Sequence, residues 1–265
     1  FHGDTLGALS VGGNPIYRRP FAPLLPGVTR IPFDDASMLA RIDQSVAAVI
    51  VEPIQAEGGV RIPSATFLHA LRRRCADAGA LLIADEVVTG FGRTGTLFAY
   101  QHCNVMPDVL VLAKALGGGM PLGAFLGHPD VMQTLSHDPP LAHVTTFGGH
   151  PVSCAAGLAA LDVLLREDLP ARAVRLGRAW LADLQPLVGT GALRAVRGLG
   201  LLVALEFESA DATRRFVARC FERGLILNWT LHCDTVVRLA PPLTITFDEI
   251  ARATAIMAQV LGGPR

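Results

Sequence analysis

Hydrophobic residues in the first half of the chain fall into short continuous runs, separated by segments with other patterns. Four runs have the length of buried strands, at 47–53, 80–84, 107–114 and 123–127. Between the first two, residues 64–79 carry apolar side chains at helical spacing, with a serine at the start and a glycine at the end. This order predicts βαβ units in a largely parallel sheet, with helices on both of its faces.

The pattern changes after Pro151. Residues 151–168 and 171–188 have the periodicity of two long helices, and we expect the break between them near Leu169 and Pro170. Shorter strands and helices follow in alternation and end in a helix over 246–262. We therefore predict an α/β fold in which a large domain with a mostly parallel sheet is followed by a smaller α+β domain. The predicted ranges are 1–170 and 171–265.

Composition narrows the functional classes. The 265 residues allow one large domain or two smaller ones, and 51% of them are hydrophobic. No apolar run reaches the ~18 residues of a membrane span, so we expect a large core and a subunit interface instead. A formal net charge of zero gives no electrostatic argument for nucleic acid or an anionic membrane. Five scattered cysteines without CxxC spacing favour reduced thiols and a cytoplasmic location, and argue against a disulfide frame or a metal site.

Candidate chemistry lies where the predicted strands end. The 23 Lys and Arg residues include a single lysine, Lys114, which follows an apolar run and precedes three glycines. A lysine can lose its proton and become a nucleophile, whereas an arginine cannot, although a lone lysine can also result from coding bias toward arginine. Glu52 and Asp85 end two other predicted strands. Because ligands bind at the carboxyl ends of parallel strands, these three side chains indicate one site.

The stretch GFGRTG at 90–95 matches the GxGxxG pattern of dinucleotide-binding proteins. In that motif the turn follows its strand directly and opens a helix, but here residues 85–89 intervene. The expected acidic residue should end the next strand, whereas Asp108 begins one. We therefore expect a glycine-rich surface turn, and keep an NAD-type oxidoreductase only as an alternative.

Five motifs then identify a family that the chain resembles. EPIQAEGG, ADEVVTGFGRTG, PDVLVLAKALGGGMPLGA, TTFGGHP and RLAPPLT have the order and spacing found in class III aminotransferases, and the resemblance spans essentially the whole chain. It implies fold type I, pyridoxal 5′-phosphate as cofactor and a homodimer with shared active sites. PFAPLLPGVTRIPF and LPARA look most like the putrescine branch, close to the ornithine and acetylornithine aminotransferases. The implied reaction moves an amino group from an ω-amine, diamine or basic amino acid to a 2-oxo acid such as 2-oxoglutarate.

The resemblance also implies roles for individual residues at the cofactor. Lys114 would bind the cofactor aldehyde as a Schiff base, and as a freed amine would then move a proton. Asp85 would pair with the pyridine nitrogen and keep it protonated. Glu86 beside it points to the opposite side of a strand, and we expect a structural role for it.

The resemblance implies further cofactor contacts for residues in other parts of the chain. Phe1 and Val87 would pack on the two faces of the cofactor ring, and His2 would also bind the cofactor. Thr146 would donate to the phosphate group of the neighbouring subunit, with Thr145 as the alternative.

Two residues would select substrates. Arg238 would bind a carboxylate of 2-oxoglutarate with its bidentate fork. When the donor has no carboxylate there, Glu52 would neutralise Arg238, because an unpaired buried guanidinium is costly. One site could then accept an amino acid and a diamine in successive half-reactions.

The chain departs from the family pattern in two places. Many members of the biosynthetic branch carry a hydrogen-bonding glutamine where this chain has Val88, while branches acting on other ω-amines often carry an aliphatic residue. The family's N-terminal third, with its phosphate-binding loop, does not precede Phe1, so we expect the chain to be a piece of a longer protein. An aminomutase or decarboxylase of the same fold, or a non-catalytic domain of a biosynthetic assembly, stays an alternative.

Overall fold

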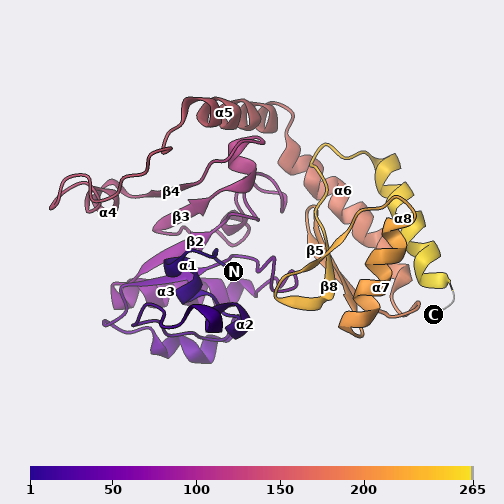
Figure 1. Cartoon of the computed structure of the whole chain (residues 1–265), viewed down its shortest axis with the longest axis horizontal. Helices are drawn as coiled ribbons and strands as arrows, with labels where there is room; N and C mark the ends of the chain where they lie inside the picture. Colours follow the sequence, from indigo (N-terminus) through magenta and orange to yellow (C-terminus); the bar gives the residue numbers. More distant parts are fainter. Residues whose placement is uncertain (264–265) are drawn as a thin grey trace.

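Two separate four-stranded sheets form the framework of the computed structural model, which describes residues 1–263 (Figure 1). In the first sheet β1, β2 and β3 are parallel neighbours, and β4 joins β3 in the antiparallel direction. The parallel pairing of β1, β2 and β3 confirms the predicted sheet. The four strands are β1 (Ala48–Val51), β2 (Leu81–Asp85), β3 (Val109–Leu112) and β4 (Ala124–Gly127).

The crossover between β1 and β2 is made by α3 (Ala65–Ala78), as the sequence predicts. Ser64 begins this helix, and its hydroxyl accepts a hydrogen bond from the Phe67 N–H at 3.2 Å. Gly79 ends it with a φ of 73°, in the left-handed region that favours glycine. The buried face of α3 packs on the sheet through residues such as Leu71, so that burial of apolar surface holds this βαβ unit together.

The second sheet is antiparallel throughout, with the strand order β5-β6-β8-β7. Two details differ from the prediction. Residues 193–199 form a strand that the sequence did not indicate, because arginines and a glycine interrupt its apolar alternation. The apolar run at 224–228 predicts a strand, but the observed strand begins only at Asn228 and has three residues. The strands are β5 (Leu193–Leu199), β6 (Leu202–Phe207), β7 (Asn228–Thr230) and β8 (Cys233–Leu239).

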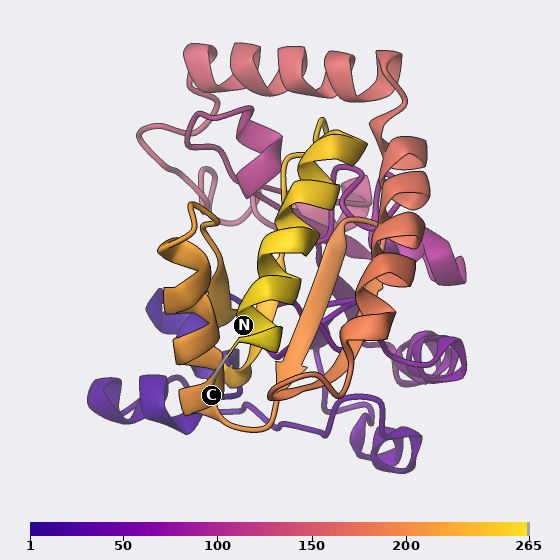
Figure 2. The ribbon, with the colours of Figure 1, turned by 90° about the vertical axis from the view of Figure 1, so that its right-hand side faces the viewer.

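Three helices pack on the second sheet and lie together on its outer side (Figure 2). Their buried faces and the buried side chains of β5, β6 and β8 form the largest apolar core. Trp180 ties two of these helices, because its indole N–H donates to Thr254 at 3.0 Å. The division of the chain at residue 170 stays a prediction. The helices are α6 (Leu169–Leu184), α7 (Ala210–Phe221) and α8 (Phe247–Gly262).

The predicted break before α6 is a single turn. Asp168 adopts a left-handed φ of 47° and its carboxylate accepts from the Ala171 N–H. Pro170 lies in the first turn of α6, where its missing N–H costs no helical hydrogen bond. The preceding helix, α5 (Pro151–Arg166), packs on the turn that follows β3.

Short helices complete the described residues, and none of them is long and apolar enough to cross a membrane. The α-helical ones are α1 (Leu6–Val11), α2 (Pro15–Arg18) and α4 (Pro129–Gln133). The 3-10 helices are η1 (Arg19–Phe21), η2 (Ala36–Arg41), η3 (Ala99–Cys103), η4 (Lys114–Gly117) and η5 (Gln185–Leu187).

Candidate active site

The three polar residues predicted at strand ends come from adjacent parallel strands. β1 and β2 pair with Val51 opposite Ala84, so Glu52 and Asp85 follow at the same edge. Asp85 in turn lies opposite Val111 of β3, three residues before Lys114. Parallel pairing therefore brings the carboxyl ends of all three strands to one edge of the first sheet, where α/β proteins bind ligands.

Asp85 is a buried carboxylate with two partners. The residue is 5% exposed, and its Oδ2 lies 2.7 Å from Nδ1 of His2. Its Oδ1 accepts a hydrogen bond from the Val87 N–H at 3.1 Å. A buried acid with an adjacent ring nitrogen is suited to hold a cationic nitrogen heterocycle, since burial strengthens the attraction between opposite charges.

Glu86, the next residue, is buried in another direction and serves the fold. Its carboxylate accepts from the Thr89 hydroxyl and from the backbone N–H groups of Ala99 and Tyr100, both at 2.8 Å. These last two bonds cap the start of η3. Burial raises the pKa of Glu86 above its ordinary value, although the three hydrogen bonds oppose the shift.

Lys114 begins η4 with a φ of 48°, a conformation that is uncommon for a residue with a side chain. It is exposed and, within residues 1–263, makes no hydrogen bond or ion pair. The glycines after it have a packing function. A Cβ at Gly118 would lie 2.4 Å from the carbonyl oxygen of Ala156, so only glycine lets α5 pack directly on this turn. The sheet and α5 thus fix the backbone at Lys114 from two sides.

Arg238 of β8 pairs with Glu57, and this corrects the predicted pairing with Glu52. The Arg238 guanidinium donates to Oε1 of Glu57, while Glu52 accepts from the Ala56 N–H at 3.1 Å. Both glutamates belong to EPIQAEGG, and the sequence analysis named Glu52 for this pairing without considering Glu57. Glu52 directly follows β1, whereas Glu57 lies at the tip of a loop.

The loop is closed by paired backbone hydrogen bonds between Gln55 and Arg61, of 3.0 and 2.9 Å. This closure directs Glu57 toward the second sheet. The Leu231 N–H donates to Glu57 Oε2 at 2.9 Å, and the His232 N–H donates to the Glu57 carbonyl at 3.0 Å. The tertiary contact between the two sheets therefore decides which glutamate meets Arg238.

Glu57 also lies within the electrostatic influence of Lys114. Burial alone would raise the pKa of Glu57, but the Leu231 N–H, Arg238 and the charge of Lys114 together lower it below its ordinary value of 4.5. The carboxylate is 7% exposed and remains ionised at neutral pH.

Phe1 contacts His232, a residue that the sequence analysis did not single out. Their ring centroids are 5.1 Å apart with the planes tilted by 39°. Tyr17 approaches the other side of His232 edge-on, and Asn14 lies 3.1 Å from its Nδ1. Burial lowers the pKa of His232. Only the turn between β7 and β8 brings this histidine to the N-terminal segment, so no local sequence signal marks it.

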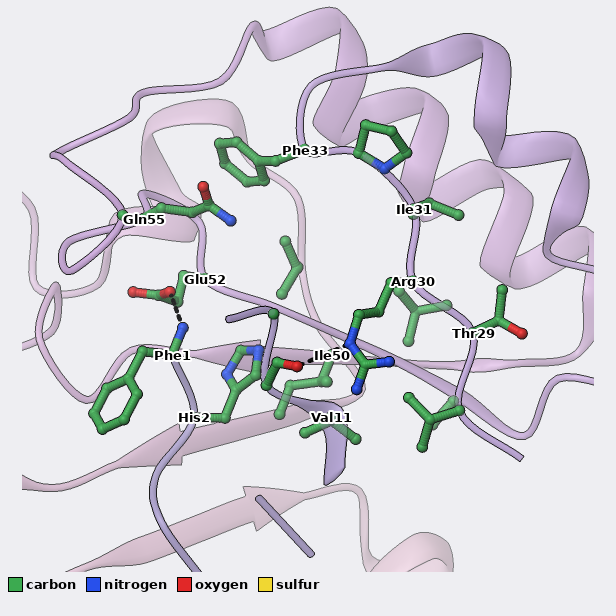
Figure 3. A pocket seen from close by; sticks show the side chains of 18 of the residues that line it. Phe1, His2, Val11, Thr29, Arg30, Ile31, Phe33, Ile50, Glu52 and Gln55 are labelled. Atoms are coloured by element: carbon green, nitrogen blue, oxygen red, sulfur yellow. Dashed lines mark hydrogen bonds and ion pairs between the residues drawn. The ribbon is translucent and has the colours of Figure 1, made fainter. Parts of the chain in front are cut away.

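A cavity of about 970 Å³ opens beside these residues (Figure 3). Phe1, His2 and Glu52 lie together at one end, and Arg30 and Thr29 lie at the other. Neither Asp85 nor Lys114 lines this cavity. It therefore adjoins the strand-end cluster and does not enclose it.

The predicted phosphate-binding threonines lie apart from this cluster. Thr145 and Thr146 belong to the exposed segment between α4 and α5, and neither side chain makes a hydrogen bond within residues 1–263. An outward position is what a contact to a second subunit requires. The role of Thr146 stays a prediction.

The GFGRTG stretch is not the surface turn that the sequence suggested. Gly90, Phe91 and Gly92 are buried, and Leu243 and Pro170 lie within about 3.2 Å of a Cβ placed on Gly92. These neighbours come from the part of the chain that builds the second sheet and its helices. The glycines therefore allow close packing between the two halves of the chain.

Comparisons with known proteins agree with this architecture. The family model described as aminotransferase class III matches residues 1–261. Putrescine aminotransferase from Pectobacterium atrosepticum is 45% identical over 271 residues, and the match covers 98% of this chain and 58% of that protein.

Two solved structures are similar in fold and sequence. One is ornithine aminotransferase from Toxoplasma gondii, whose active site holds PLP at partial occupancy. Its TM-score is 0.91 at 38% identity, and the match covers 98% of this chain and 62% of the Toxoplasma chain. The other is acetylornithine aminotransferase from Elizabethkingia anophelis, with a TM-score of 0.82 at 38% identity. This match covers 91% of this chain and 61% of the Elizabethkingia chain. The chain thus spans about three fifths of the length of these relatives.

Proposed function

The chain belongs to the class III aminotransferases and has their fold type I architecture, and we propose that the protein of which it is part transfers amino groups with pyridoxal phosphate. The amino donor is an ω-amine, a diamine or a basic amino acid, and the acceptor is a 2-oxo acid such as 2-oxoglutarate. The names of the relatives support this choice over an aminomutase or decarboxylase. The observation that carries the proposal is the buried Asp85–His2 pair at the sheet edge that also presents the only lysine.

The residues present fit the cofactor. Asp85 would hold the protonated ring nitrogen, with His2 orienting the carboxylate from its other oxygen. Phe1 and Val87 would bound the two faces of the ring, and Lys114 would hold the aldehyde end. When bound, the cofactor supplies an electron-withdrawing ring that stabilises negative charge on the substrate carbon.

Lys114 would also move the proton. As a neutral amine it would take a proton from the substrate carbon that bears the amino group and deliver it to C4′ of the cofactor within the same half-reaction. This role requires an amine that exchanges protons near neutral pH, which arginine cannot do. The conformation imposed on Lys114 by η4 and α5 would keep its position fixed through the cycle.

The Glu57–Arg238 ion pair would adapt the site to two substrate classes. Arg238 would bind a carboxylate of 2-oxoglutarate when Glu57 moves aside. With an amine donor that lacks this carboxylate, Glu57 would return to Arg238 and keep the guanidinium paired, as in the structure. The switch proposed for Glu52 thus passes to Glu57, because Glu57 is the residue in contact.

A homodimer is part of the same proposal. Large apolar side chains are exposed on β4, on the segment before α5 and on α5 itself, and Phe125 contacts His143 of that segment at 5.3 Å between ring centroids. Thr146 lies in the same segment, where a second copy could receive it. We call this surface the β4–α5 face; it comprises Phe125, Leu126, Leu141, Val144, Phe147 and Leu158.

A cytoplasmic location is supported by five cysteines that are all free.

The test is a cofactor titration of the protein, followed by absorbance spectra with putrescine and with ornithine. We expect a near-visible absorbance band that disappears on adding the true donor and is absent in Lys114→Ala. Borohydride should fix the cofactor on the peptide that contains Lys114. A wild-type protein that binds no cofactor and shows no such band would leave only the non-catalytic alternative.

A further inference from the structure

Arg197 of β5 crosses from the second sheet to the loop that carries Glu57. Its Nε donates to the carbonyl of Val60 at 3.1 Å, and its Nη2 donates to the carbonyl of Gly59 at 2.5 Å. Its remaining nitrogen, Nη1, pairs with Glu206 on the neighbouring strand β6. The guanidinium fork therefore ties two consecutive peptide groups of the loop to the second sheet.

The loop needs such a restraint, because its backbone is strained. Val60 is fully buried with a φ of 50°, which is a rare conformation for a β-branched residue. Gly59 has a φ of 99°, and a Cβ there would lie 3.3 Å from the Cys233 side chain. Glu57 is only two residues before Gly59, so the hold on these peptide groups determines where its carboxylate lies.

Arg93, in the first half of the chain, holds the segment that follows Arg238. Its Nη1 donates to the carbonyls of Leu201 and Pro241, at 3.1 and 2.6 Å, and its own carbonyl accepts from the Leu201 N–H at 3.0 Å. Pro241 is three residues beyond Arg238. Among residues 1–263 Arg93 has no carboxylate partner, and burial together with the charge of Arg238 lowers its pKa to about 10. The half-buried guanidinium is thus held by carbonyls beside the segment that carries Arg238.

We infer that Arg197 and Arg93 are positioning residues that fix Glu57 against Arg238 and thereby set the preference between substrates with and without a carboxylate for Arg238. Neither arginine contacts the carboxylate of Glu57. Each holds the backbone that carries one member of the pair, Arg197 at the Glu57 loop and Arg93 after β8. A contact between a carboxylate and a guanidinium depends on sub-ångström placement, so loosening either side should weaken it. The substrate preference rests on the proposed function, whereas the placement of Glu57 does not.

The first experiment follows the Glu57 carboxyl itself by ¹³C NMR titration, with the signal assigned from Glu57→Gln. Arg197→Ala should raise the Glu57 pKa by about half a unit or more, because the contacts with Leu231 N–H and Arg238 that lower it are weakened. The matched control is Arg194→Ala, which removes an arginine–glutamate pair from the same strand without a contact to the loop. An unchanged Glu57 pKa in a folded Arg197→Ala protein would overturn the inference.

The second experiment compares kcat/KM for 2-oxoglutarate and for the diamine putrescine, which has no carboxylate. Arg197→Ala should raise the ratio of kcat/KM for 2-oxoglutarate to that for putrescine about tenfold, because a loosened Glu57 competes less with the substrate carboxylate for Arg238, and Arg197→Lys should recover part of the wild-type ratio. Arg93→Ala loosens the segment after Arg238 instead and should lower this ratio. Parallel losses for both substrates would show a merely structural role and contradict the inference. Absence of transamination in the wild type would contradict the proposed function instead, and the NMR titration would still decide the placement of Glu57. If Arg93→Ala does not fold, the half-exposed Arg197 provides the test alone.

Discussion

Nδ1 of His2 lies 2.7 Å from Oδ2 of the buried Asp85, although 83 positions separate the two residues in the chain. The backbone N–H of Val87 holds the other carboxylate oxygen. Asp85 is therefore fixed in orientation from both sides. A fixed, buried negative charge needs no reorganisation when a cationic ring nitrogen binds beside it.

Asp85→Asn should retain the shape of the site and remove this charge. We expect kcat/KM for transamination to fall by about 10²–10³-fold, because the asparagine amide cannot stabilise a protonated ring nitrogen. Steady-state kinetics with saturating cofactor give the value, and the melting temperature serves as the control for folding. Near wild-type kinetics in Asp85→Asn would remove this residue from the proposed mechanism.

Glu57→Gln should shift the substrate preference toward dicarboxylates. Without the ion pair Arg238 is free to bind a substrate carboxylate, and an amine donor without a carboxylate leaves the guanidinium unpaired. We expect the ratio of kcat/KM for 2-oxoglutarate to that for the diamine to rise about tenfold, equivalent to ~1.4 kcal/mol. Glu52→Gln is the matched comparison. A larger shift in Glu52→Gln than in Glu57→Gln would restore the pairing predicted from sequence.

Glu57 should also contribute to the pH dependence of stability. Its pKa is lower in the folded protein than the ordinary value of 4.5, so its contribution is present above about 4.5 and is lost as the pH falls through the folded-state pKa. The free energy of unfolding, measured by urea denaturation at a series of pH values, should therefore decrease less steeply on acidification in Glu57→Gln. Identical slopes for the two proteins would contradict the assigned shift.

Gly118→Ala should destabilise the turn that carries Lys114. The new methyl group would lie 2.4 Å from the Ala156 carbonyl oxygen, and the φ of 57° at this position disfavours any side chain. We expect a loss of about 1–3 kcal/mol in unfolding free energy, measured by urea denaturation. Gly123→Ala is the control, since its nearest neighbour outside the adjacent residues lies at 3.7 Å. Equal stabilities of the two variants would argue against close packing of α5 on η4.

Leu158→Glu should weaken the proposed homodimer. Leu158 is 70% exposed on α5, and a charge there would remain desolvated in an interface between two copies. Light scattering after size-exclusion chromatography should show a dimer for the wild type and a shift toward monomer for the variant. Phe221→Glu on α7, at a residue 65% exposed but outside the β4–α5 face, should leave the mass unchanged. Dissociation by Phe221→Glu alone would place the interface elsewhere.

Local patterns predicted much of the fold because they depend on neighbouring residues. The strand before Asp85, the helix that begins after Ser64 and the break before α6 all lie where periodicity and capping residues placed them. The strand β5 was missed, because Arg194, Arg197 and Gly198 interrupt its apolar pattern. Its place in the sheet is decided by pairing with β6, a contact that no local signal encodes.

The sequence by itself determined which side chains stand at the ends of the parallel strands, and its motifs determined the family. Lys114, Asp85 and Glu52 follow directly from strand order, since parallel strands end at one edge. Only the tertiary structure decided that Glu57 pairs with Arg238, because the closed loop 55–61 and the second sheet set the direction of that carboxylate. It also decided that GFGRTG lies buried between the two halves of the chain. Both outcomes depend on contacts between residues more than 100 positions apart, which periodicity does not record.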